Sequence, residues 1–418
     1  MLRIRRPRRE EAAPPYFLVT AFTTMMLVTG MNILVPVLPG YARSFQVDAT
    51  QVGVVVSAFA VGRLLFDFAG GALADKFGVR IICITGCSVT GVASLVAGLT
   101  ESFSMLLAAR LVQGIGSALY MSAATALVVA LLPPGRAGRW MSIYQGIFLV
   151  GLAVGPLLGG VVAGLFGLRA PFHAYALMCL VSLVLSTLRL PGKRALQRLT
   201  FPSKGSPDNE VTPGAALRRL LRHPAFRVSL LAILAMFIIR AGVRNTAVPL
   251  YADEALKMSS VMIGLLVTTA AVGQLAVMWH AGKVLDSWGR RPVLITSLFG
   301  ATVSVLLFGV AVDPWILFLC MLSLGLTTAY STAAPTVIMV DVADPRITGS
   351  AVGVQRMATD CGQLAGPILV GVMVDSTNFT ATFVIAAGMV LLTALAALSL
   401  PETRHLASRR PGQGTQPD

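Results

Sequence analysis

The stretch that decides the fold is GALADKFGVR at residues 71–80, which returns in altered form as GKVLDSWGRR at residues 282–291. Each copy has glycine at its first and eighth positions, aspartate at its fifth and arginine at its tenth. The glycines permit a tight turn and a close approach between helices, and the aspartate can face the positive N-terminal end of a neighbouring helix. We expect both stretches to be gating loops, through Gly71, Asp75, Lys76, Gly78, Arg80, Gly282, Asp286, Gly289, Arg290 and Arg291.

The two loops belong to a repeat that covers most of the chain. At a constant offset of 211 residues, the matches include Gly53/Gly264, Gly62/Gly273, Gly114/Gly325, Gly155/Gly366 and Pro156/Pro367. Upstream, Asn32/Asn245 and Pro36/Pro249 match at an offset of 213. Such a repeat predicts two six-helix halves related by an axis along the membrane normal, with a substrate site between them near the midplane.

Composition excludes a water-soluble fold, because 56% of the residues are hydrophobic, only 12% are charged and the mean hydropathy is +0.78. Apolar runs long enough to cross a bilayer occur at residues 16–38, 51–73, 79–98, 103–131, 140–165, 170–190, 225–250, 259–284, 291–311, 314–341, 347–373 and 379–400. Backbone groups must be satisfied internally in lipid, so these runs are expected to be helices. The predicted fold is all-α, with twelve transmembrane helices in two six-helix bundles at residues 16–190 and 225–400. A basic N-terminus (1–15), a linker (191–224) and a tail (401–418) complete the chain.

The positive charge follows the predicted topology. If the N-terminus is inside, cytoplasmic segments hold 25 of the 33 lysines and arginines, and the outer loops hold Arg43, Arg169 and Lys257. This asymmetry predicts that both termini are cytoplasmic and that the protein lies in the plasma membrane. The net charge of +15 is then a consequence of topology and does not indicate nucleic-acid binding.

Helices 4 and 5 carry further motifs. Helix 4 contains ARLVQGIG at residues 109–116, and helix 5 contains GLAVGPLLGG at residues 151–160. Closely spaced glycines let helices approach one another, and Pro156 bends helix 5, so we expect either packing or gating from Gly151, Gly155, Pro156, Gly159 and Gly160. With the doubled loop, these motifs resemble the major facilitator superfamily, and helix 5 resembles its twelve-helix drug:proton antiporter branch. The resemblance covers essentially the whole chain, with one departure at Val79, where the loop motif usually has a basic residue.

Ionisable residues within the predicted helices are the strongest site candidates, because such residues are costly in a membrane. Arg63/Asp67 and Arg356/Asp360 are both spaced i,i+4, so each pair either locks helix packing or carries the coupling proton. Burial favours a neutral carboxyl group and a nearby arginine favours a charged one, so movement can change its protonation. Asp360 is the first choice and Asp67 the second. The family resemblance adds a role in proton transfer for Arg110.

Arg240 and Arg244 share a face in the outer half of helix 7 and cannot neutralise one another. They require an acid such as Asp360, water or an anionic ligand, unless Arg244 reaches the lipid headgroups. Other polar residues either line the substrate cavity or join helices, namely Asn32, Gln113, Gln145, Gln274 and Gln363.

The combined prediction is a secondary transporter that exports small hydrophobic or amphipathic compounds in exchange for protons. No nucleotide-binding motif is present, so an ion or substrate gradient is the expected energy source. We expect no enzymatic activity, metal, cofactor or nucleic-acid partner, and a monomer in the bilayer. The alternatives are a proton-coupled importer or facilitator of a small organic anion, and a non-transporting membrane receptor.

Overall fold

The computed structural model describes residues 16–132, 137–192, 218, 220–343 and 348–400. The predicted N-terminus, nearly all of the linker and the tail lie outside these residues. The described segments consist of helices and the turns between them, with no strand. The predicted all-α fold is confirmed.

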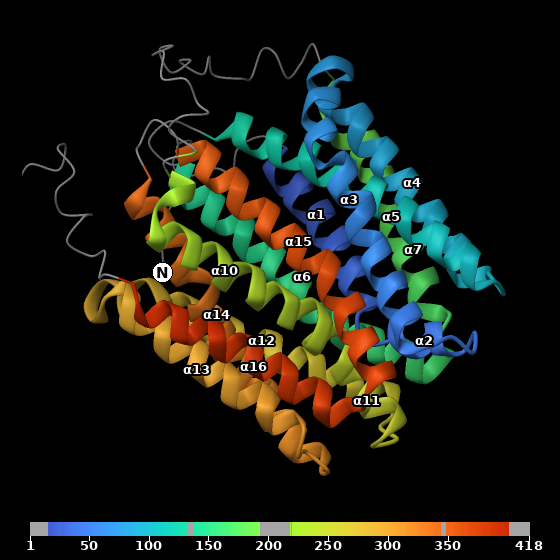
Figure 1. The fold of residues 1–418 in the computed structure, drawn as a ribbon. Coiled ribbons are helices and arrows are strands. Elements are labelled where there is room, and N and C mark those ends of the chain that lie inside the picture. The colour runs from blue at the N-terminus through green and yellow to red at the C-terminus, as the bar shows by residue number, and fades with distance from the viewer. Residues whose placement is uncertain (1–15, 133–136, 193–217, 219, 344–347, 401–418) are drawn as a thin grey trace, which may run out of the picture. The chain divides into compact units, whose positions relative to one another are not determined.

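Most of the predicted spans appear as single helices (Figure 1). The first half of the chain contains α1 (Phe17–Ile33), α2 (Leu38–Arg43), α3 (Ala49–Phe77), α4 (Val79–Leu99), α5 (Phe103–Leu131), α6 (Ala137–Phe166) and α7 (Ala170–Arg189). The second half contains α10 (Pro224–Ile238), the π-helix η2 (Ile239–Ala247), α11 (Val248–Glu254), α12 (Ser260–Trp288), α13 (Arg290–Phe308), α14 (Pro314–Val342), α15 (Thr348–Ser376) and α16 (Phe379–Leu398). Among the described residues, eleven helical segments are long and apolar enough to cross a membrane, and α1 is a shorter apolar helix.

A proline marks the irregular part of the first span in each half. The predicted run 16–38 ends as a helix at Ile33, because Pro36 lacks an N–H and its ring disfavours helical backbone before it. Its repeat partner Pro249 stands at the start of α11, directly after η2. The first half therefore breaks its first span at this proline, whereas the second half changes there from a π-helix to an α-helix and continues to Glu254.

The described chain packs as two compact units that do not follow the two halves of the sequence. Unit 1 comprises residues up to Leu34, Val61–Gly155 and Arg169–Ser206, and unit 2 comprises Val35–Ala60, Pro156–Leu168 and the chain from Pro207. The ends of α3 and α6 thus belong to the same unit as α10–α16. The boundaries predicted from the repeat, 16–190 and 225–400, stay a prediction.

Unit 1 is built around α4, which lies beside α5 and α7 (Figure 1). Glycines allow the close approach of α4 and α5. A Cβ at Gly86 would lie 2.7 Å from the backbone nitrogen of Tyr120, and one at Gly116 would lie 2.7 Å from that of Thr90. Tyr120 is fully buried in the same contact, where its hydroxyl donates to Thr23 at 2.6 Å. Small residues therefore set the packing of this unit, as is usual for membrane helices.

In unit 2, α13 lies beside α14 and α16 (Figure 1). The core contains Leu294, Leu298, Phe308, Leu317 and Phe383, each fully buried. Many apolar side chains on the outside of the same helices are exposed, among them Trp315 and Leu319. This pattern fits helices that present an apolar surface to lipid.

The repeated loops anchor each half in the same way. Gly78 and Gly289 have φ angles of 97° and 98°, which favour glycine and make the turn between helices. Arg80 donates to the carbonyl of Thr187, and Arg291 donates to that of Leu398 at 2.7 Å, each 107 residues further along the chain. The expected close helix approach at Gly71 and Gly282 is wrong, since a Cβ at either would meet nothing within 4 Å.

The second loop carries a charge network at the position where the first departs from the family pattern. Arg290 reaches Asp286 at 3.2 Å and Asp341 of α14 at 3.3 Å. Asp286 therefore faces an arginine of its own loop. The repeat partner of Arg290 is Val79, which is buried in an apolar cluster with Ile82 and Cys83.

Candidate functional site

Two backbone contacts in unit 2 join the early parts of the chain to α12 and α15. A Cβ at Gly53 of α3 would lie 2.6 Å from the carbonyl carbon of Pro367 in α15. A Cβ at Gly264 of α12 would lie 2.7 Å from the carbonyl oxygen of Pro156 in α6. Because Gly53/Gly264 and Pro156/Pro367 are repeat partners, these are two copies of one contact.

The same relation holds one turn further along the helices. A Cβ at Gly371 would lie 2.8 Å from the carbonyl carbon of Ala49, and one at Gly160 would lie 2.5 Å from the carbonyl oxygen of Ser260. Gly160/Gly371 and Ala49/Ser260 again differ by 211 residues. Gly160, one of the glycines predicted to matter in the fifth helix, therefore allows this helix (α6) to pack directly against α12.

Asp375 adds a polar contact to only one of these two copies. One of its carboxylate oxygens accepts from the backbone N–H of Ala49 at 2.9 Å, and the other accepts from the N–H of Thr50 at 2.7 Å and from its hydroxyl at 2.6 Å. The carboxylate thus caps the N-terminus of α3, where the helix dipole also favours negative charge. Its repeat partner is Gly164, which has no side chain. Sequence reasoning missed Asp375, because the predicted helix ended at residue 373.

Further polar contacts lie at the same end of unit 2. Arg43 pairs with Glu254 at 2.5 Å and also donates to the carbonyl of Val47 at 2.7 Å. Ser57 donates to the carbonyl of Leu364 at 2.6 Å. Together these contacts tie α2 to α11 at the ends that the sequence predicts to face outside, and α3 to α15 further along the two helices.

The charges predicted on α3 and α5 both lie in unit 1. Arg63 reaches Asp67 at 3.5 Å, a long separation for an ion pair, and both side chains are half-buried. Ser122 of α5 donates to the backbone carbonyl of Asp67 at 3.0 Å. Arg110 donates to Gln113 at 2.7 Å, and Gln113 donates to Ser94 at 2.9 Å. Since Gln113 is fully buried in this network, its interactions are those of a residue that joins helices.

The second predicted pair, on α15, is arranged differently from the first. The side chain of Asp360 is half-buried, whereas that of Arg356 is exposed. Arg356 forms no ion pair in the part of the chain that the structure describes. The i,i+4 spacing alone therefore does not bring this arginine onto its aspartate.

Arg240 and Arg244 lie in η2, nearer the middle of their span than predicted. The helix runs without interruption over 31 residues, Pro224–Glu254, so Ile239 is its central residue. Arg244 is 3% exposed, and its Nε and Nη1 are buried without a hydrogen-bond partner. Arg240 lies over the ring of Phe237 at 5.7 Å. The buried guanidinium of Arg244 argues against the alternative that it reaches the lipid headgroups.

The remaining polar candidates differ in their surroundings. Asn32 donates to the carbonyl of Val28 at 2.8 Å and is packed against Gly155, so it serves helix packing in this structure. Gln145 is exposed, Gln363 is half-buried, and Gln274 has a buried amide oxygen without a donor. Gly151 packs against Thr29, and Gly159 is buried.

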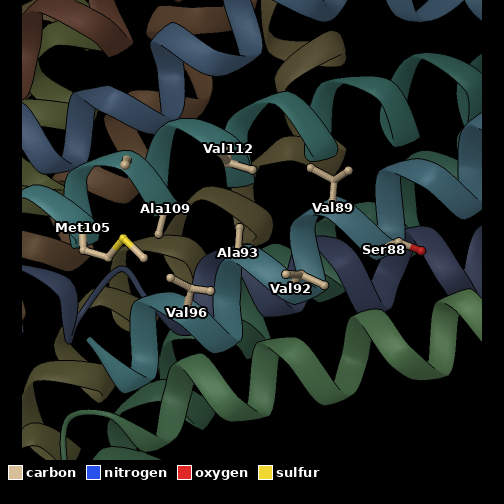
Figure 2. Close-up of a pocket in the computed structure, with 9 residues that line it drawn as sticks. Ser88, Val89, Val92, Ala93, Val96, Met105, Ala109 and Val112 are labelled. Atoms are coloured by element: carbon tan, nitrogen blue, oxygen red, sulfur yellow. The ribbon is translucent and has the colours of Figure 1, made fainter. Parts of the chain in front are cut away.

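Two apolar grooves on unit 1 contain none of these candidates. Figure 2 shows the larger one, about 450 Å³, between Val92 and Val96 of α4 and Met105 and Val112 of α5. The second, about 370 Å³, lies between α4 and α7. Their side chains are apolar and many are exposed, as expected of a surface that faces lipid acyl chains.

Comparisons with known proteins agree with this architecture. The family model of the Major Facilitator Superfamily matches residues 20–254 and 234–417. Multidrug resistance protein 2 of Bacillus subtilis is 23% identical over 384 residues, which cover 91% of this chain and 93% of that protein. Quinolone resistance protein NorA of Staphylococcus aureus is 23% identical over 360 residues, covering 85% and 89%. The crystal structure of the nucleoside transporter NupG superimposes with a TM-score of 0.77 at 14% identity, covering 92% of this chain and 98% of that one. The chain therefore belongs to the major facilitator superfamily and is a multi-pass membrane transporter, not an enzyme.

Proposed function

We propose that this transporter exports small hydrophobic or amphipathic compounds in exchange for protons, by alternating access. The observation that carries the proposal is an acid inside a membrane-spanning helix, Asp67, which holds Arg63 only at 3.5 Å. The relatives named for multidrug and quinolone resistance support export, as does the glycine–proline pattern of α6. Family membership favours transport over a non-transporting receptor.

A carboxylate in this position is suited to couple transport to a proton. While it is charged, Asp67 attracts the Arg63 guanidinium; once protonated, it loses that attraction and the arginine is released. Asp67 and Asp360 are both half-buried within helices long enough to cross the membrane. Export then follows if the proton enters from outside and leaves inside.

The test uses purified protein in liposomes with an acidic interior and a trapped pH indicator, and ethidium as the compound added outside. Exchange predicts ethidium uptake together with a rise of the internal pH. Asp360→Asn and Asp67→Asn should each reduce this coupled signal by about tenfold or more, since an amide cannot carry the proton. Asp48→Asn is the matched control, because Asp48 is exposed and lies outside the spans. Ethidium transport that is independent of the proton gradient and is retained in both variants would contradict the proposal.

A second candidate is import of a small organic anion. It is favoured by the buried, positively charged Arg244, which is unusual for a protein that binds only neutral or cationic compounds. Accumulation of a test anion by cells that express the protein, instead of its depletion, would support import.

A further inference from the structure

The arginine pair of η2 is buried without a counter-charge. Neither Arg240 nor Arg244 forms an ion pair within the described part of the chain. Arg240, four residues before Arg244, carries the same charge and cannot neutralise it. Two guanidinium nitrogens of Arg244 are enclosed without an acceptor.

The local backbone places both arginines on one face. In a π-helix the i→i+5 hydrogen bonds widen the turn, so residues four apart lie nearly above one another. The hydroxyl of Thr246 reinforces this turn by donating to the carbonyl of Ala241, five residues back, at 2.8 Å. Gly242 falls halfway between the arginines and therefore lies on the opposite face. A Cβ there would lie 2.7 Å from the carbonyl carbon of Gly366, so the arginine face is turned away from α15.

A charge in this position needs a partner. Arginine stays protonated in proteins, and an unpaired buried charge costs several kcal/mol. Arg240 and Arg244 closely follow Ile239, the central residue of the 31-residue helical span Pro224–Glu254. Substrate sites in transporters built from such repeats are expected near the middle of the spans.

We infer that Arg240 and Arg244 bind the anionic group of the transported compound, a carboxylate or phosphate ester on an otherwise apolar molecule. Planar guanidinium groups match such anions through paired, charge-assisted hydrogen bonds. Next to Arg244 in the sequence, the buried amide oxygen of Asn245 also has no donor. This inference rests on the proposed transport function and names the class of compound that it serves.

Binding of a matched series of probes tests the inference. The full chain is placed in nanodiscs of zwitterionic phosphatidylcholine, and binding of radiolabelled 4-phenylbutyrate is competed with 4-phenylbutanamide and 4-phenylbutylamine. Carboxylate binding should exceed amide binding about tenfold or more in the wild type. Arg244→Gln and Arg240→Gln should remove that preference, Arg244→Lys should keep part of it, and Arg169→Gln, at an exposed arginine, should leave it unchanged. Equal binding of carboxylate and amide to the wild type would overturn the inference.

Thermal unfolding without ligand separates loss of binding from loss of fold. If Arg244 has no partner in the empty protein, Arg244→Gln should raise the melting temperature while it weakens carboxylate binding. A lowered melting temperature would mean that Arg244 already has a partner, and would overturn the inference. Proton-driven ethidium exchange without any carboxylate preference would overturn the inference and leave the proposed export standing. Preferential carboxylate binding without transport of any compound would support the anion site and overturn the proposed export.

Discussion

The N-terminus of α3 is capped by a residue from another helix. Asp48, which precedes α3, is exposed, and its backbone N–H donates to the side-chain oxygen of Gln51 at 3.2 Å. The N–H groups of Ala49 and Thr50 are instead bound by Asp375 of α15. A contact that normally stabilises one helix therefore also joins two helices.

Replacement of Asp375 should loosen this end of unit 2. Asp375→Ala removes both acceptors and the favourable charge, and we expect it to weaken the contact between α3 and α15 by about 1–3 kcal/mol. Double electron–electron resonance between labels at Ser44→Cys and Ala255→Cys should show a shift to longer distances, after the exposed Cys361 has been replaced. Asp48→Asn is the matched control, and an equal shift in both variants would contradict a specific role for Asp375.

Helix α15 meets α3, and α12 meets α6, through backbone atoms. Gly53 against Pro367 and Gly264 against Pro156 leave no room for a side chain. Because the two contacts are repeat partners, the same pair of residue types, a glycine packed against a proline carbonyl, forms both of them.

A larger side chain at either Gly53 or Gly264 should therefore push apart the helices that meet there. Gly53→Val should disfavour the packing of α3 on α15, and Gly264→Val that of α12 on α6, each by about 1–3 kcal/mol, since overpacking forces the helices apart. The same pair of spin labels measures the change. Gly146→Ala on α6 provides the control, because a Cβ there meets nothing within 4 Å, and it should leave the distance distribution unchanged. Opposite effects of the two valine variants would contradict the symmetry of the contacts.

For the whole molecule, the sequence predicted the helical fold and its spans well. Apolar runs and the 211-residue repeat depend on local composition, and helices keep their backbone hydrogen bonds local. Contacts across the fold were harder to predict. Asp375 caps Ala49 across 326 residues, and nothing near Asp375 marks it as a cap. For Gln113 the sequence left two roles open, lining the cavity or joining helices, because nothing in the sequence identifies Ser94 as the partner of its amide.

The predicted orientation of the whole chain has a direct test. In intact cells, a membrane-impermeant maleimide should label Ser44→Cys, in a loop predicted to be outside, and should not label Lys283→Cys, near the loop after α12. Both positions need a background without Cys361, the exposed one of the five cysteines. The reverse labelling pattern would show that the positive charges do not face the cytoplasm.

The arginine anchors of the two loops bear on how the protein is made. Arg80 binds the carbonyl of Thr187 and Arg291 that of Leu398, so each partner is synthesised 107 residues after its arginine. At about 5–20 residues per second, each loop waits roughly 5–20 seconds for the helix that holds it. During that interval the earlier helices of the half are already in the membrane. Each half can therefore form this hydrogen bond only after its last helix has been synthesised, and the two halves do so independently.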